Sequence, residues 1–153
     1  MRTSAWETWR ASAARTPLLA AGRAYGFEQC LEQATVDVAL ERVTDALKRE
    51  GFGILTQIDV KDTLKKKLDV DFRRYLILGA CNPSLAYKAL SIDAQIGLLL
   101  PCNVVVQEAD GGAIVSIADP RAMFTVVDNP ALAPIVDEAD QRLRRVMASL
   151  APA

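Results

Sequence analysis

Two spacings of hydrophobic residues recur along this chain, and each is typical of one kind of secondary structure. Between Thr35 and Gly51, apolar residues return every three or four positions, and charged residues fill the positions between them. This spacing gathers the apolar side chains on one face of a helix. Thr35 is a favourable N-cap, and Gly51 can take the left-handed conformation that ends a helix. The pattern therefore predicts a helix from Thr35 to Gly51.

The same spacing predicts three more helices. Val60–Leu68 has apolar residues four apart, with Asp59 as its cap and lysines on the solvated side. Asn82 caps the next helix and is followed by a proline at the first helical position, so a short helix is expected over Pro83–Leu90. The closing helix, Pro134–Leu150, has acids before arginines, which matches the helix dipole.

Short apolar runs and loose alternation of apolar and polar residues predict the strands. Tyr75–Cys81 is apolar on both faces, which places it centrally in a sheet. Gly97–Leu100 also has the composition of a buried strand. The predicted strands are Tyr25–Gln33, Gly53–Ile58, Val70–Cys81, Val104–Glu108 and Ala113–Ala118.

Turn residues connect these segments. Asp110–Gly112 predicts a tight hairpin between the last two strands, because glycine accepts positive φ. Pro101 cannot donate a hydrogen bond to a sheet, so it marks the start of a strand, an edge or a bulge. Asp119 and Asn129 each precede a proline, and we expect them to cap short helical turns.

The predicted element order is strand, helix, strand, helix, strand, helix, strand pair, helix. Because hairpins and helices are mixed, this order favours an α+β fold with helices packed on one face of a sheet. A doubly wound nucleotide-binding fold is disfavoured, because no glycine-rich phosphate loop follows a strand. A chain of 153 residues fits one domain, which we assign to residues 25–150.

Residues 1–24 differ in composition from the rest of the chain. They are rich in alanine, arginine, serine and threonine and contain one acid, Glu7. A targeting presequence is one interpretation, and a terminal extension or a misplaced start site is the other. The apolar piece Pro17–Ala21 is too short for a signal-peptide core, which favours the second. We expect an N-terminal extension, partly helical or disordered, in which Trp6 and Trp9 are spaced to hold a short helix against the body or a neighbour.

The charge balance narrows the classes of partner. Lysine and arginine number 18 against 19 acids, and a net charge of −1 gives no long-range attraction to nucleic acid or anionic lipid. We interpret the basic run Lys65–Lys67 as a solvated helix face rather than an anion site. We therefore expect no nucleic-acid partner and no membrane partner.

Histidine and cysteine usage narrows the chemistry. There is no histidine, which excludes serine-type triads and three-histidine zinc sites. Three cysteines in no disulfide-like pattern indicate free thiols in a reducing compartment. No window approaches the roughly 18 apolar residues of a membrane span. These features predict a cytoplasmic protein.

Two Cys-Asn pairs form the candidate site. Cys81 and Asn82 end the central strand. Cys102 and Asn103 begin the next apolar run, so we expect the two pairs to meet at one rim of the sheet. Asp59, at another strand end, is a further candidate for ligand binding, although capping explains it more simply.

Two interpretations of the thiols stay open. In one, both thiols are small buried hydrophobes, and the asparagines are caps or turn formers. In the other, Cys81 precedes a helix whose N–H groups lower the pKa of its thiol, and Cys102 resolves it in a redox or sulfur-transfer pair. A zinc site is disfavoured, because too few ligands remain without histidine. We expect no metal and no cofactor.

Four segments of the chain resemble one known family, the domain of unknown function 302 family. They read G-F-G-I-L-T-Q-I-D-V (Gly51–Val60), I-L-G-A-C-N-P (Ile77–Pro83), L-L-L-P-C-N-V-V-V (Leu98–Val106) and D-P-R-A-M (Asp119–Met123). The resemblance spans roughly residues 25–150. It implies a curved antiparallel sheet similar to the TATA-binding-protein-like arrangement, a homodimer, and a cytoplasmic protein of bacteria or archaea. It implies no activity, because the family is defined by sequence rather than by a reaction.

The sequence favours a homodimeric module that binds a small apolar or anionic ligand or a protein partner, because no catalytic constellation accompanies the well-defined core. The alternative is a thiol-dependent redox or sulfur-handling protein that uses Cys81 and Cys102. A third hypothesis is a structural role in an assembly. Whether the protein is an enzyme is left open. The candidate ligand-binding residues are Cys81, Asn82, Cys102, Asn103 and Asp59.

Overall fold

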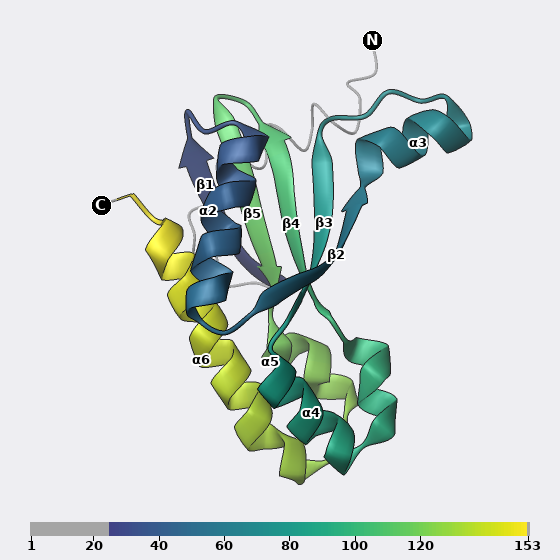
Figure 1. The fold of residues 1–153 in the computed structure, drawn as a ribbon, viewed down its shortest axis with the longest axis vertical. Coiled ribbons are helices and arrows are strands. Elements are labelled where there is room, and N and C mark those ends of the chain that lie inside the picture. The colour runs from purple at the N-terminus through teal and green to yellow at the C-terminus, as the bar shows by residue number, and fades with distance from the viewer. Residues whose placement is uncertain (1–24, 153) are drawn as a thin grey trace.

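The computed structural model describes residues 25–152, and the predicted extension, residues 1–24, lies outside them. The described residues form an open five-stranded sheet in the order β1-β5-β4-β3-β2, with every neighbouring pair antiparallel (Figure 1). The strands are β1 (Gly26–Glu32), β2 (Gly53–Asp59), β3 (Tyr75–Cys81), β4 (Cys102–Ala109) and β5 (Gly112–Ala118). The helices are α2 (Val36–Arg49), α3 (Val60–Leu68), α4 (Pro83–Ile92), α5 (Pro120–Met123) and α6 (Ala133–Leu150), with 3₁₀ helices η1 (Ala94–Leu99), η2 (Phe124–Val126) and η3 (Pro130–Leu132).

Polar caps fix where the first helices begin and end. The Thr35 side chain accepts a hydrogen bond from the backbone N–H of Val38 at 3.2 Å, which starts α2 as predicted. Gly51 follows that helix with a φ of 83°, the left-handed conformation expected of it. Asp59 caps α3 by accepting a hydrogen bond from the backbone N–H of Asp62 at 2.9 Å. These predicted boundaries are confirmed.

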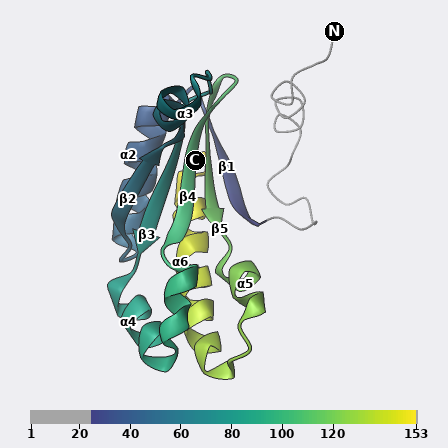
Figure 2. The same cartoon turned by 90° about the vertical axis from the view of Figure 1, so that its right-hand side faces the viewer.

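Helices α2 and α6 cover one face of the sheet and bury its hydrophobic side chains (Figures 1 and 2). Alternate residues of the central strands point into this layer, and Leu78 and Val104 there are fully buried. Leu47 of α2 and Leu143 of α6 meet them and are equally inaccessible. The predicted α+β fold with helices on one sheet face is confirmed. The TATA-binding-protein-like arrangement stays a prediction.

A second, smaller core lies beyond the end of the sheet. Ala89 of α4, Ile96 of η1 and Leu132 of η3 are buried together, and Phe124 and Ile135 pack against them. In Figure 1 these short helices lie below the strands, beside the first half of α6. The two halves of α6 therefore serve different cores, because its second half belongs to the layer under the sheet.

The predicted strand at Gly97–Leu100 is wrong. Most of this run belongs to the 3₁₀ helix η1, which Asp93 starts by accepting a hydrogen bond from the backbone N–H of Gln95 at 2.9 Å. Leu98 is 84% exposed, so the run is not buried. A run this short cannot be assigned to strand or helix by composition alone.

The strand predicted from Val70 begins five residues later, at Tyr75. Before that point the backbone carbonyl of Phe72 accepts a hydrogen bond from the Lys61 side chain at 3.1 Å. Val70 itself is 42% exposed. The apolar composition of this segment therefore reflects a loop beside α3, not a longer strand.

Gly79 of β3 lies where the sheet face opposite the helices is crowded. A Cβ added at Gly79 would lie 2.7 Å from Cγ of Pro101, which directly precedes β4, and closer still to Oγ1 of Thr56. No side chain fits there unless one of these neighbours moves. β2, β3 and the residue before β4 therefore approach each other closely at the end of the sheet nearest the second core.

We expect Gly79→Ala to lower the free energy of unfolding by about 1–3 kcal/mol, because the added methyl group overpacks this contact. Gly53→Ala in β2 is the matched control, since a Cβ there meets nothing within 4 Å. Urea denaturation followed by circular dichroism measures both variants. Equal stability of Gly79→Ala and the wild-type protein would contradict the expected crowding.

Candidate functional site

A small hollow lies where the sheet ends and the second core begins. Its volume is about 50 Å³, and its walls come from β3, β4, α4, α5, η2 and α6. Apart from Asn82 and two thiols, the side chains that line it are hydrophobic, among them Leu85, Phe124 and Val136. We refer to this cavity as the hollow.

Cys81 and Cys102 both line the hollow. Cys81 is the last residue of β3, and Cys102 is the first residue of β4, where it pairs with Ala80. The adjacent strands thus bring the two segments together at one end of the sheet. Strand alternation assigns the two side chains to different sheet faces, so they approach the hollow from different directions.

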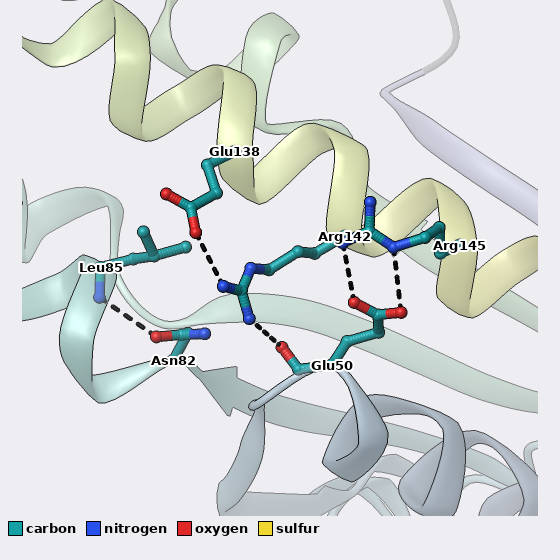
Figure 3. A network of polar contacts seen from close by, with 6 residues as sticks. All are labelled: Glu50, Asn82, Leu85, Glu138, Arg142 and Arg145. Atoms are coloured by element: carbon teal, nitrogen blue, oxygen red, sulfur yellow. Dashed lines mark hydrogen bonds and ion pairs between the residues drawn. The ribbon is translucent and has the colours of Figure 1, made fainter.

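Asn82 also lines the hollow, together with the two thiols, and its side chain is almost fully buried. Its Oδ1 atom accepts a hydrogen bond from the backbone N–H of Leu85 at 3.1 Å, which starts α4 (Figure 3). A Cβ added at Gly51 would lie 3.0 Å from its Nδ2 atom. Asn82 is therefore a helix cap with a structural role. This agrees with the interpretation of the two asparagines as caps or turn formers.

The other two candidate residues lie elsewhere. Asp59 is the last residue of β2 and caps α3. It lies at the opposite end of β2 from Gly53, which pairs with Cys81. Asn103 is exposed and pairs with Gly79, on the sheet face opposite that of its neighbour Cys102. Neither residue lines the hollow, so only three of the five candidate residues come together.

Burial sets the acidity of both thiols. Together with a smaller contribution from the nearby Cys81, it raises the pKa of Cys102 to about 11. Burial also raises the pKa of Cys81. The expectation that a helix start lowers the pKa of Cys81 is therefore wrong. Pro83 has no N–H to offer, and the N–H of Leu85 is already taken by Asn82.

The thiol-dependent redox hypothesis receives no support from these observations. A nucleophilic cysteine needs a depressed pKa, and both thiols of the hollow have the opposite shift. All three cysteines of the chain are free, and Cys30 on β1 is exposed. Among residues 25–152, no group of three histidine, cysteine, aspartate or glutamate side chains is placed to hold a metal ion.

A polar network ties α6 to the end of α2 beside the hollow (Figure 3). Arg142 donates to the backbone carbonyl of Glu50 at 3.0 Å and to the carboxylate of Glu138 at 2.7 Å. Arg145 donates two hydrogen bonds to the Glu50 carboxylate, at 3.0 and 2.9 Å. These bonds lower the pKa of Glu50. From the sequence, the arginines of this helix were expected to complement the helix dipole. Nothing in the sequence indicated that Arg142 and Arg145 bind Glu50, which is more than 90 residues away in the chain.

A larger groove adjoins the hollow and was missed by the sequence analysis. Its volume is about 370 Å³, and Phe124 and Val136 line both cavities. Arg121 stands at its rim, with one ion pair to Asp137 at 3.2 Å and one to the buried Asp140 at 3.3 Å. The contributing segments, α5, η2, η3 and the start of α6, follow two Pro-capped turns. Those turns were the only sequence signal of the groove.

Comparison with known proteins places this small α+β domain in a family. The chain belongs to the family described as "Domain of unknown function DUF302", whose model matches residues 28–150. A crystal structure of an uncharacterized conserved DUF302 protein from Bacillus stearothermophilus is similar, with 28% sequence identity and a TM-score of 0.76. The match covers 84% of this chain and 100% of that chain. No curated protein matches the chain.

The family predicted from four sequence segments is thereby confirmed, and the same fold occurs in a solved structure. The match carries no reaction with it. Within the part of the chain that the structure describes, no helix combines the length and the hydrophobicity needed to cross a membrane. The hollow and the groove are therefore the features of the domain that bear on its function.

The raised pKa of Cys102 predicts a pH dependence of stability. Because the folded pKa lies above the usual value of 9.0, the folded state favours the protonated thiol. That stabilisation is complete below about pH 9 and is lost as pH rises towards 11, by about 2–3 kcal/mol in total. Cys102→Ala removes the titrating group and is expected to lose less stability over this range. Urea unfolding of both proteins between pH 8 and 11 measures the difference, and parallel pH profiles would contradict the assignment.

Proposed function

We propose that this domain is a binding module for a small, mainly apolar molecule that occupies the hollow and the adjoining groove. The observation that carries the proposal is that Phe124 and Val136 line both cavities, so the hollow and the groove lie side by side. Ligand sites are concave and mostly apolar, with a few polar groups that set orientation. The hollow and the groove together have these properties.

The two volumes constrain the shape of the ligand. The hollow, at about 50 Å³, holds only a few atoms, whereas the groove, at about 370 Å³, is within the range of ligand pockets. An extended molecule fits this pair best. Its narrow apolar end enters the hollow, and its body lies in the groove along Val127 and Leu132.

The ion pairs of Arg121 and the side chain of Asn129 favour a neutral polar end on that molecule. Arg121 is already paired with Asp137 and Asp140. The Asn129 side chain accepts a hydrogen bond from the backbone N–H of Ala131 at 3.0 Å, which leaves its amide N–H groups to donate. An alcohol, ether or carbonyl oxygen could accept such a bond without disturbing the ion pairs of Arg121.

The thiols and the surface charges support two further parts of the proposal. Three free cysteines suit a reducing compartment, and we infer a cytoplasmic location. Lys65 and Lys66 on α3 are paired with acids of the same segment, which supports a role without nucleic acid. The module is proposed to act as a homodimer, as the family resemblance implies.

The test is a titration of ¹⁵N-labelled protein with 1-hexanol, a neutral molecule with an extended apolar body. We expect saturable chemical-shift changes confined to the ends of β3 and β4 at the hollow, α4, α5, residues 124–132 and the first half of α6. Ala139→Leu fills the wall of the hollow from α6 and is expected to weaken binding at least tenfold. Ala148→Leu on the exposed side of the same helix is the matched control and should bind as the wild-type protein does.

Two results would contradict the proposal. One is the absence of saturable binding to the wild-type protein, and the other is equal affinity of Ala139→Leu and Ala148→Leu. If Ala139→Leu does not fold, Ala86→Leu fills the same hollow from α4 and replaces it. Circular dichroism of every variant establishes that the fold is retained.

A further inference from the structure

Asp140 of α6 is a charged residue whose burial the packing of the two cores does not explain. Its side chain is only 2% exposed, and it lines neither the hollow nor the groove. Its Oδ2 atom forms ion pairs with Arg121 and Arg144, whereas its Oδ1 atom is buried without a hydrogen-bond partner among residues 25–152. Burying a carboxylate is costly, and an unsatisfied buried oxygen adds to that cost. Because stability does not account for such a group, its role lies with the arginines that it contacts.

Arg144, one turn further along α6, anchors this carboxylate. Its Nε atom donates a hydrogen bond to Oδ2 of Asp140 at 3.0 Å. The Arg144 guanidinium also lies over the ring of Phe27 on β1, 4.5 Å from the ring centre, in a cation–π contact. Phe27 in turn packs against the main core. Asp140 is thereby held in place from the side of the sheet.

Asp140 in turn holds Arg121 of α5, which lines the groove. Nε of Arg121 lies 3.3 Å from Oδ2 of Asp140, and its Nη2 atom lies 3.2 Å from Oδ1 of Asp137. The guanidinium is planar, and these two nitrogens form one of its edges. Within residues 25–152 its third nitrogen, Nη1, has neither an ion pair nor a hydrogen bond. Arg121 therefore presents unused N–H donors in a fixed orientation.

The charges around Arg121 decide which chemical groups these donors can bind. The two arginines and two aspartates of the network carry no net charge. Asp128, a further acid that lines the groove, is exposed. An anionic ligand would meet this additional carboxylate without an uncompensated cation nearby, so it is repelled. A neutral hydrogen-bond acceptor can bind the donors of Nη1 without that repulsion.

A cationic ligand is disfavoured for a different reason. Asp128 is the groove residue that could pair with an ammonium group, but within the described part of the chain no hydrogen bond or ion pair holds its side chain. Such a side chain loses rotamer freedom upon binding, which lowers the affinity that it can provide. Arg121 is already held by two acids and loses less. The preorganised charged group of the groove is therefore a donor.

We propose that Arg121 is the specificity-determining residue of the binding site and that its Nη1 atom donates to an uncharged acceptor on the ligand, of which a ketone carbonyl is the simplest case. Asp140, fixed by Arg144, is the positioning residue that orients Arg121. This inference rests on the proposed binding function and names the chemical class of the ligand's polar end. The Asn129 amide, which lines the same groove, supplies a second donor to that class of group.

A matched pair of ligands tests the role of Arg121. In 2-methyl-1-pentene a CH₂ group replaces the carbonyl oxygen of 2-pentanone, so the two molecules share size and shape but differ in the acceptor. We expect Arg121→Met, which keeps an apolar stem, to weaken binding of 2-pentanone by roughly fivefold to tenfold, because one hydrogen bond from a charged donor is lost. Binding of 2-methyl-1-pentene should stay unchanged. Titration of ¹⁵N-labelled protein measures both dissociation constants.

Asp140→Asn tests the positioning role, because it keeps the shape of the side chain and removes its charge. We expect it to weaken binding of 2-pentanone about as much as Arg121→Met does, and to add little in combination with Arg121→Met. A merely structural role would weaken binding of both ligands and would add to the effect of Arg121→Met. Glu138→Gln on the same helix is the matched control, because Glu138 pairs with Arg142. It should bind both ligands as the wild-type protein does.

If Asp140→Asn does not fold, Arg121→Lys replaces it. Lysine keeps the charge but cannot pair with both acids from one planar edge, so affinity for 2-pentanone alone should fall. Unchanged binding of 2-pentanone by Arg121→Met, or an equal loss for both ligands, overturns the role of Arg121 and leaves the proposed binding function standing. Additive effects of Asp140→Asn and Arg121→Met, or full binding of 2-pentanone by Arg121→Lys, overturn the positioning role. If neither ligand binds the wild-type protein, the proposed function fails, and the role of Arg121 fails with it.

Discussion

Burial of one sheet face under α2 and α6 is the interaction on which the rest of this structure depends. Leu78, Val104 and Leu143 are inaccessible to solvent there, and each fully buried aliphatic side chain contributes roughly 1.5–3 kcal/mol. The two bonds from Arg145 to Glu50 link α6 to the end of α2. Because α6 is longer than this layer needs, its first half extends beyond the sheet and supports a second core.

The hollow follows from that extension. The main core ends at Ala80 and Cys102, and the second core begins at Ala89, so the space between them is lined by residues of both. Protein interiors contain few voids, and the voids that persist without water are lined by apolar groups, as this one mainly is. The thiols contribute to this wall as small hydrophobic groups, which agrees with the raised pKa of each.

The sequence predicted most of the architecture but only part of the site. Periodicity and caps located α2, α3 and α6 because local spacing determines them, as at Thr35 and Asp59. The apolar run at Gly97–Leu100 was misassigned, because composition does not distinguish a short strand from a 3₁₀ turn. Asp59 and Asn103 were grouped with the thiols because each ends or begins a strand, yet only strand register tells which end and which face a residue occupies.

The uneven protection of the sheet edges is the feature that packing within one chain leaves unexplained. A strand such as β2, exposed along nearly its whole length, is an aggregation hazard unless something occupies it. Glutamates perform this role on β1, and Leu55 occupies a comparable exposed position on β2. Among residues 25–152, the side chains of the chain itself therefore protect the edge at β1 and leave the backbone of β2 open to pairing.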